Sequence, residues 1–245
     1  MRTAEDTTTD ALFGGTLSVV QPRTGYRFNV DSLWLAAFAG RGQGVRQVLD
    51  LGAGVGVVTL CLHHLGGVSR AVLVERDARL AELCERNLER AGLAARVLCA
   101  DLGRGLPKAA REGAELVVAN PPYFEPGERR PARADREPSR AGALAPFVRA
   151  AALALGHNRS RAAFVYPARS LGRLLALGER SGLVAKRLRF VHAFAAEPAR
   201  VALVELRRAK PGGLVVEPPV VEWQRAGVPS PELARLSAGR AGGRS

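Results

Sequence analysis

Short apolar runs recur along the middle of the chain, and stretches with the spacing of amphipathic helices separate them. Each run has the length of a buried strand and is rich in Val, Leu and Ala; the runs are Val45–Leu51, Ala71–Val74, Arg96–Ala100 and Leu116–Ala119. The connections between them are short, as in sheets whose strands are joined by crossover helices. The pattern predicts a Rossmann-like α/β fold, with a mostly parallel twisted sheet and helices on both of its faces.

The flanking segments add elements to this sheet. Downstream we expect a helix near 143–155, a strand at Ala162–Tyr166, a helix near 170–180, and an antiparallel hairpin of Leu188–Phe194 with Arg200–Leu206. Upstream, a short hairpin of Leu17–Val20 with Tyr26–Asn29 is expected to lead into a helix that includes Phe38.

The two ends of the chain have no clear periodicity. Residues 1–11 are polar and rich in Thr, which predicts a disordered N-terminus. Residues 209–245 are rich in Pro, Gly and Arg, which predicts a loose tail. We therefore expect a single domain over residues 12–208.

Composition narrows the class of protein. With 245 residues and 47% hydrophobic content, the chain can bury one substantial core. No apolar stretch reaches membrane-spanning length, and the first residues lack the layout of a signal peptide, so we expect a cytoplasmic protein without a membrane partner. Cys61, Cys84 and Cys99 lack metal-ligand spacing and lie in apolar helix or strand patterns, which predicts reduced core thiols and no metal site.

A glycine-rich turn follows the first apolar run. The stretch from Asp50 to Gly56 places Gly52, Gly54 and Gly56 where the backbone can approach a ligand closely before a helix begins. The dinucleotide-binding fingerprint requires its third glycine at position 57, where this chain has Val57. NAD is therefore disfavoured as the ligand.

Acidic residues end the next two runs. Glu75 follows the second run, where a carboxylate can accept hydrogen bonds from both hydroxyls of a ribose, and Asp101 follows the third, where it could accept from an adenine amino group. Open α/β sheets bind their ligands at the carboxyl ends of their strands. The turn and the two acids are therefore expected to share one ligand.

The tetrapeptide Asn120-Pro121-Pro122-Tyr123 follows the fourth run. The Asn120 side-chain carbonyl and the Pro121 main-chain carbonyl can accept the N–H groups of a flat amine, and the Tyr123 ring can stack on its π system. This combination suits the methylation of a planar nitrogen.

The chain is strongly basic, with a formal net charge of +13. Such a charge favours a polyanionic partner, because Lys and Arg near phosphates release counterions. Basic residues cluster directly after the tetrapeptide, and we expect them to hold the phosphates of a nucleic-acid substrate; they are Arg129, Arg130, Arg133 and Arg136. No obligatory protein partner is evident.

Taken together, the glycine turn, the two acids and the tetrapeptide resemble class I S-adenosylmethionine-dependent methyltransferases. The segment from Gln21 to Ala36, the tetrapeptide with Phe124, and the stretch Val191–Arg200 resemble the bacterial tRNA adenine-N6 methyltransferases that modify the adenosine beside the anticodon of a valine tRNA. This resemblance, over roughly residues 12–208, implies S-adenosylmethionine as cofactor and tRNA as substrate. It also implies that residues 12–40 close over the methionine end of the cofactor through Arg27, Phe28, Asn29 and Asp31, and that Asp50 and Asn120 contribute to the cofactor site.

Other functions stay open at this stage. The same tetrapeptide serves methyltransferases that act on a protein glutamine side chain, although that family normally carries a separate N-terminal helical domain. A ribosomal-RNA or DNA base methyltransferase is a further alternative. Outside the enzymes, the chain could be a non-catalytic RNA-binding module.

Overall fold

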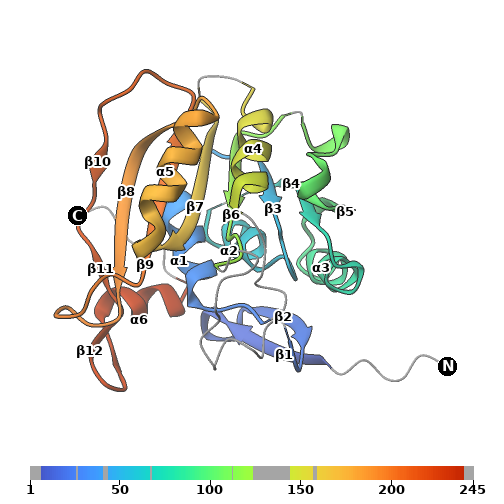
Figure 1. Ribbon diagram of the computed structural model, residues 1–245. Coiled ribbons are helices and arrows are strands. Elements are labelled where there is room, and N and C mark those ends of the chain that lie inside the picture. The colour runs from blue at the N-terminus through green and yellow to red at the C-terminus, as the bar shows by residue number, and fades with distance from the viewer. Residues whose placement is uncertain are drawn as a thin grey trace.

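The computed structural model describes residues 7–25, 27–40, 44–66, 68–111, 113–123, 144–156 and 159–239. Its centre is a nine-stranded sheet in the order β10-β8-β9-β7-β6-β3-β4-β5, with β11 also paired to β8 (Figure 1). The strands are β3 (Gln47–Leu51), β4 (Arg70–Glu75), β5 (Ala94–Cys99), β6 (Leu116–Ala119), β7 (Arg161–Pro167), β8 (Val184–His192), β9 (Val201–Arg207), β10 (Val215–Val216) and β11 (Val220–Val221). Strands β3 to β7 are mutually parallel, and β9 runs antiparallel to both β7 and β8. The predicted fold class and the antiparallel hairpin near the C-terminus are both confirmed.

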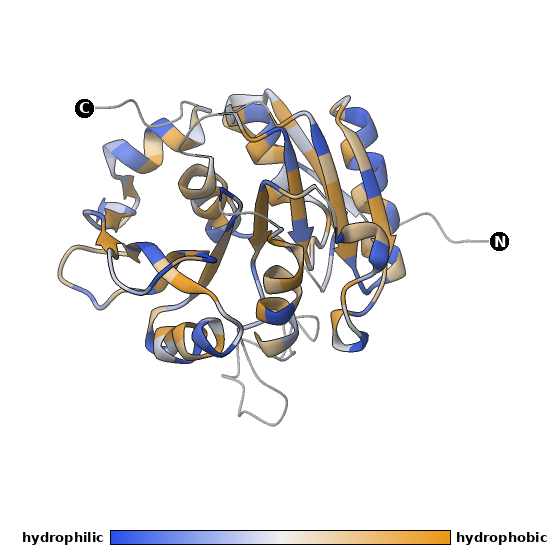
Figure 2. Cartoon of the chain, turned by 90° about the horizontal axis from the view of Figure 1, so that it is seen from above, coloured by the Kyte–Doolittle hydropathy of each residue, from blue (hydrophilic) through white to orange (hydrophobic). Residues whose placement is uncertain are grey.

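Helices cover both faces of this sheet because alternate strand residues point to opposite sides. The helices are α1 (Val30–Ala39), α2 (Val57–Gly66), α3 (Ala78–Arg90), α4 (Leu144–Ala154) and α5 (Leu171–Arg180). One core contains α1, α2 and α3 with residues such as Val48 and Val118, and the other contains α4 and α5 with Leu49 and Val117. Figure 2 shows strands coloured mostly as hydrophobic, with helices on either side that carry both hydrophobic and hydrophilic residues.

The strand order reverses between β3 and β6. Strand β3 pairs with β4 on one side and with β6 on the other, and its register sets Leu51 opposite both Val74 and Ala119. The residues that follow these strand ends therefore meet at one edge of the sheet. Such a reversal point is where open α/β sheets bind their ligands.

The N-terminal segment differs from the prediction. Residues 7–11, predicted to be disordered, instead belong to β1 (Thr7–Leu12), which pairs antiparallel with β2 (Leu17–Pro22); residues 1–6 lie outside the described residues. Leu17–Val20 does not pair with Arg27–Asn29. The β-branched threonines suit a strand. The segment Arg27–Asn29 instead leads directly into α1, so the expected partner of β2 was wrong.

The C-terminal segment is not a loose tail over residues 209–239. Strands β10 and β11 pair in parallel with β8, β12 (Trp223–Arg225) pairs with β13 (Val228–Pro229), and α6 (Pro231–Ser237) buries Leu233 and Leu236. The outer edge of β8 offers unpaired backbone groups, and these strands satisfy them. Sequence periodicity could not show this, because each strand has only two or three residues.

Candidate active site

The glycine turn lies at the reversal point of the sheet. The backbone N–H groups of Gly52 and Ala53 both donate to the Val74 carbonyl, at 2.8 and 3.1 Å. Gly52, Gly54 and Gly56 have positive φ angles, which side chains rarely adopt. A Cβ atom on Gly56 would lie 2.8 Å from Cys84 Sγ, so α3 also requires a glycine here.

Glu75 at the end of β4 is tied to this turn. Its Oε2 accepts from the Gly54 N–H at 2.8 Å, and its Oε1 accepts from the Asp77 N–H at 2.9 Å. The residue is 7% exposed. Each carboxylate oxygen has a second lone pair, so the group can still accept from ligand hydroxyls. The geometry thus fixes an acceptor beside the turn.

Asp50 lies inside the fold beneath the same turn. It accepts from Thr59 Oγ1 at 2.8 Å and is 1% exposed. Burial, opposed by the hydrogen bonds from Thr59, raises the pKa of Asp50 from 3.8 to about 7. Through this buried hydrogen bond Asp50 connects the end of β3 to α2.

Asp101 lies two residues beyond the end of β5 and is exposed. Its Oδ1 accepts from the Gly103 N–H at 2.8 Å, so it also caps the short 3-10 turn that follows. The position beyond the third parallel strand is the predicted one. Its contact with an adenine amino group stays a prediction.

The tetrapeptide Asn120–Tyr123 begins where β6 ends, and α1 lies beside it. Asn120 Nδ2 donates to Ser32 Oγ at 3.4 Å, and Pro121 is buried. Tyr123 donates its hydroxyl to Asp31 Oδ2 at 2.6 Å. Within the described part of the chain no donor reaches Asn120 Oδ1, so this oxygen is available to a bound amine.

Asp31 connects the tetrapeptide to more distant parts of the chain. Asn29 caps α1 by accepting from the Asp31 N–H at 3.1 Å, and its Nδ2 donates to Asp31 Oδ2 at 3.0 Å. Asp31 Oδ1 accepts from Arg200 Nη1 at 2.5 Å. Burial alone would lower the pKa of Arg200, but the Asp31 and Glu222 carboxylates outweigh it and the pKa is raised. Asp31 is thus a hub of hydrogen bonds at the site.

Arg27 and Phe28 contact the N-terminal hairpin. Arg27 Nη2 pairs with Asp10 Oδ2 at 2.7 Å, and its Nη1 donates to Thr8 Oγ1 at 2.8 Å. The Phe28 N–H donates to Gln21 Oε1 at 3.1 Å, and the ring packs on the core that contains α1. Asn29 and Asp31 lie beside the tetrapeptide, whereas Arg27 contacts the hairpin of β1 and β2. A cofactor contact by any of these four stays a prediction.

Several site residues were missed from the sequence. Ser32 contacts Asn120, Arg200 contacts Asp31, and a Cβ atom on Gly52 would lie 2.7 Å from the Phe147 ring of α4. Ser32 follows Asp31 in a segment already singled out, but nothing local marks Arg200 or Phe147. The predicted RNA contacts Arg129, Arg130, Arg133 and Arg136 lie outside the described residues.

Comparison with solved structures agrees with this architecture. A predicted O-methyltransferase from Agrobacterium tumefaciens superposes with a TM-score of 0.65 at 22% identity, over 86% of this chain and 97% of that one. A Thermus thermophilus 16S rRNA N2 G1207 methyltransferase, solved with AdoMet and guanosine, gives a TM-score of 0.57 at 22% identity, over 83% of this chain and 50% of that one. The fold is that of the class I methyltransferases.

Sequence comparison finds relatives of part of the chain. Residues 32–136 match the model described as "Methyltransferase small domain". The chain is also 33% identical over 112 residues to a tRNA1(Val) (adenine(37)-N6)-methyltransferase from Enterobacter sp. strain 638, and 33% identical over 112 residues to one from Cronobacter sakazakii. Each match covers 44% of this chain and spans 45% of the length of the relative. The predicted resemblance to this family is confirmed.

Two further properties bear on the class of protein. No helix in the described ranges has both the length and the apolar content needed to cross a membrane. Among the same residues, no three His, Cys, Asp or Glu side chains are grouped as metal ligands.

Proposed function

We propose that this protein is an S-adenosylmethionine-dependent methyltransferase that modifies the N6 amine of adenine in RNA, with adenine 37 of tRNA1(Val) as its substrate. The observation that carries this proposal is the placement of Asn120–Tyr123 beside the glycine turn. The register sets Leu51 opposite Ala119, so Gly52 and Asn120 follow paired residues. A cofactor on the turn and an amine on the tetrapeptide would therefore be neighbours.

The residues around the turn fit S-adenosylmethionine. The positive φ angles of the glycines and the lack of Cβ atoms let the backbone approach a ligand, and Glu75 presents a carboxylate that suits a ribose. When bound there, the cofactor supplies an electrophilic methyl group on a sulfonium. The chain's contribution is to hold the accepting nitrogen in line with that methyl group, and positioning of this kind can supply about 7–11 kcal/mol.

The tetrapeptide binds and orients the amine in this proposal. Asn120 Oδ1 and the Pro121 carbonyl accept its N–H groups and stabilise the positive charge that develops as the nitrogen becomes tetrahedral. Tyr123 stacks on the base, an interaction worth about 1–3 kcal/mol. Its hydroxyl is already donated to Asp31, which fixes the orientation of the ring. No general base is needed beforehand, because the proton becomes acidic once the methyl group has moved.

RNA as the substrate is supported by the net charge of +13 and by the names of the relatives. The arginines from Arg129 to Arg136 are proposed to contact the phosphates of the tRNA. A cytoplasmic location follows from this role. The same fold also serves the methylation of rRNA in one structural relative.

The proposal can be tested by incubating the purified protein with labelled S-adenosylmethionine and total RNA from a strain that lacks the gene. Digestion to nucleosides should give labelled N6-methyladenosine. The matched control is Asn120→Ala, which should give no product under the same conditions. Label in a guanine or cytosine nucleoside would reject the adenine assignment. In a parallel incubation with total protein from the same strain, label found as methylglutamine would assign the chain to the alternative function.

A further inference from the structure

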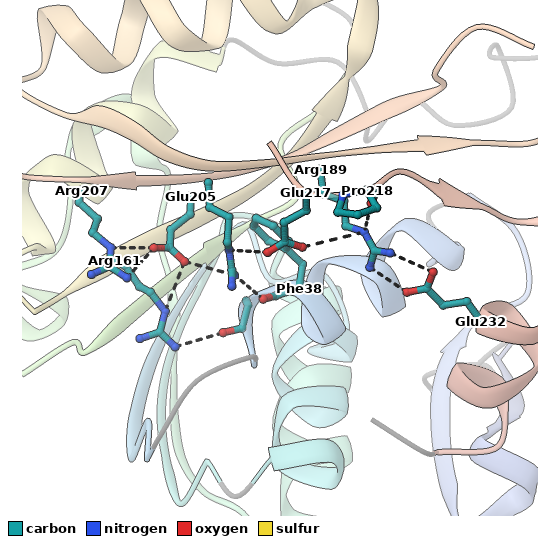
Figure 3. Close-up of polar contacts among 10 residues, drawn as sticks. Phe38, Arg161, Arg189, Glu205, Arg207, Glu217, Pro218 and Glu232 are labelled. Carbon is teal, nitrogen blue, oxygen red and sulfur yellow. Dashed lines mark hydrogen bonds and ion pairs between the residues drawn. The ribbon is translucent and has the colours of Figure 1, made fainter. Parts of the chain in front are cut away.

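The C-terminal segment, residues 209–239, is fastened to the sheet edge by ion pairs. Arg189 of β8 binds Glu232 of α6 through two parallel bonds of 2.8 and 2.9 Å, and its Nε donates to the Pro218 carbonyl at 2.8 Å (Figure 3). Arg187, also on β8, pairs with Glu217 at 3.4 Å. Paired N–H bonds from one guanidinium fix geometry as well as distance. The segment is therefore held at a defined position on β8.

The C-terminal segment contains a buried carboxylate, that of Glu222, which contacts α1. Glu222, directly after β11, is 4% exposed. Its Oε1 accepts from Trp34 Nε1 at 2.8 Å and from Arg200 Nη2 at 2.8 Å. A buried carboxylate is costly unless cations and donors compensate it, and these two contacts do so.

Arg200 lies between this carboxylate and the tetrapeptide. Its Nη2 is bound to Glu222 and its Nη1 to Asp31, which is fully buried and accepts the Tyr123 hydroxyl at 2.6 Å. A continuous series of hydrogen bonds thus runs from Glu222 through Arg200 and Asp31 to Tyr123. We call these four residues the relay. A planar guanidinium with its donors in a fixed fork can bind two carboxylates at once, which an ammonium group does less well.

Two residues hold the Asp31 side chain from different sides. Asn29 holds it from the start of α1, and Arg200 holds it from the loop before β9. Without Arg200 the Asp31 carboxylate would be buried without a cation, and a buried charge that has lost its partner reorganises or takes up a proton. Either change would alter the acceptor on which the Tyr123 hydroxyl depends.

We propose that Arg200 and Glu222 are positioning residues for the tetrapeptide. They act through Asp31 and fix the ring plane of Tyr123, on which the planar acceptor base stacks. This inference rests on the proposed function, because it assigns the relay to the substrate side of that site.

The test compares Arg200→Gln, Arg200→Lys and Glu222→Gln with the control Arg189→Gln. Arg189 fastens the same segment through Glu232 but takes no part in the relay. In single-turnover methyl transfer to RNA, Arg200→Gln should lower the maximal rate by about 10- to 100-fold, as expected for misplaced reactants. Arg200→Lys should restore part of the loss, Glu222→Gln should lose less than Arg200→Gln, and cofactor affinity should not change. Arg189→Gln should keep the rate within about twofold while lowering thermal stability.

A second measurement does not depend on the reaction. The chain has three tyrosines, so ring signals of ¹³C-tyrosine-labelled protein can be assigned, with Tyr123→Phe identifying Tyr123. The Tyr123 signal should move in Arg200→Gln and Glu222→Gln and stay in place in Arg189→Gln. Wild-type protein that methylates no RNA, with the Tyr123 signal still moving, would refute the proposed function and leave the relay standing. An unmoved signal in both relay variants, or equal rate losses in Arg200→Gln and Arg189→Gln, would overturn the relay.

Discussion

The two sides of the site are built in different ways. The proposed cofactor side is made largely of backbone, since the glycine turn after β3 donates to the Val74 carbonyl and to Glu75 of the neighbouring parallel strand β4. The proposed acceptor side is made largely of side chains that come from α1, the end of β6, the loop before β9 and the C-terminal segment. One side is local in sequence, and the other joins residues up to 188 positions apart.

This difference indicates a division of tasks. A backbone turn at strand ends can bind the part of a ligand that many enzymes share, because its shape depends on glycines and strand register. A side-chain cluster can be changed residue by residue, which suits selection of the acceptor. Substitutions on the cofactor side should therefore lower cofactor affinity or stability, whereas substitutions on the acceptor side should lower the rate of methyl transfer.

The largest effect is expected on the acceptor side. Asn120→Ala should slow methyl transfer by about 100- to 1,000-fold, by analogy with the loss of one aimed polar group at other reacting centres. Cofactor affinity should stay within about threefold, because the turn and Glu75 are intact. Asn120→Asp keeps acceptor oxygens at the same position and should lose less. Single-turnover transfer measures the rate for each variant, and calorimetry measures its affinity for the cofactor. A fall in cofactor affinity as large as the fall in rate would contradict the division of tasks between the two sides.

Asp50 should make stability depend on pH. Its pKa is raised to about 7 from 3.8, so between these values the folded protein keeps a proton that the unfolded chain releases. Stability contributed by this group is therefore lost as pH rises from about 4 to about 7, by up to about 4 kcal/mol.

Asp50→Asn removes this titration and keeps an acceptor for Thr59 Oγ1. Urea unfolding of both proteins across this pH range should show wild type losing stability relative to the variant as pH rises. A difference between the two proteins that is independent of pH would contradict the raised pKa.

Gly56→Ala tests the shape of the turn. The φ angle of Gly56 is 83°, and an added Cβ would lie 2.8 Å from Cys84 Sγ, so we expect a loss of about 1–3 kcal/mol in the free energy of unfolding. Combining it with Cys84→Ala removes the clash but leaves the backbone strain. A double-mutant cycle should therefore show a favourable coupling between the two substitutions. If the effects of the two substitutions on the free energy of unfolding simply add, the destabilisation by Gly56→Ala comes from backbone strain and not from the contact with Cys84.

Glu75→Ala should give an effect no larger than that of Gly56→Ala, and it should appear in cofactor binding. Losing a charged acceptor for ribose hydroxyls is expected to weaken S-adenosylmethionine binding by about 1–3 kcal/mol, measured by calorimetry. Glu82→Ala provides the control, since Glu82 lies exposed on α3 and pairs with Arg86. Equal affinities for the wild type and Glu75→Ala would remove Glu75 from the cofactor site.

The sequence was sufficient to predict the parallel strands, the turn and the acids that follow them. These features depend on local apolar runs and on the residues directly after them, as with Glu75, which follows the run Ala71–Val74 and is the last residue of β4. The partner of β2 could not be predicted in this way, because Thr7–Leu12 shows no strong alternation of apolar residues. The contact of Arg200 with Asp31 joins residues 169 positions apart, and no periodicity reports such a pairing. The short strands β10 and β11 depend on the edge of β8 rather than on their own composition.

The most direct test of the central claim uses a defined substrate. Unmodified tRNA1(Val) transcript is incubated with S-adenosylmethionine and the protein, next to a transcript in which adenine 37 is replaced by guanine. Mass spectrometry of nuclease fragments should find one methyl group on N6 of adenine 37 in the first transcript and none in the second. Equal methylation of both transcripts, or methylation of neither by protein that binds the cofactor, would contradict the account.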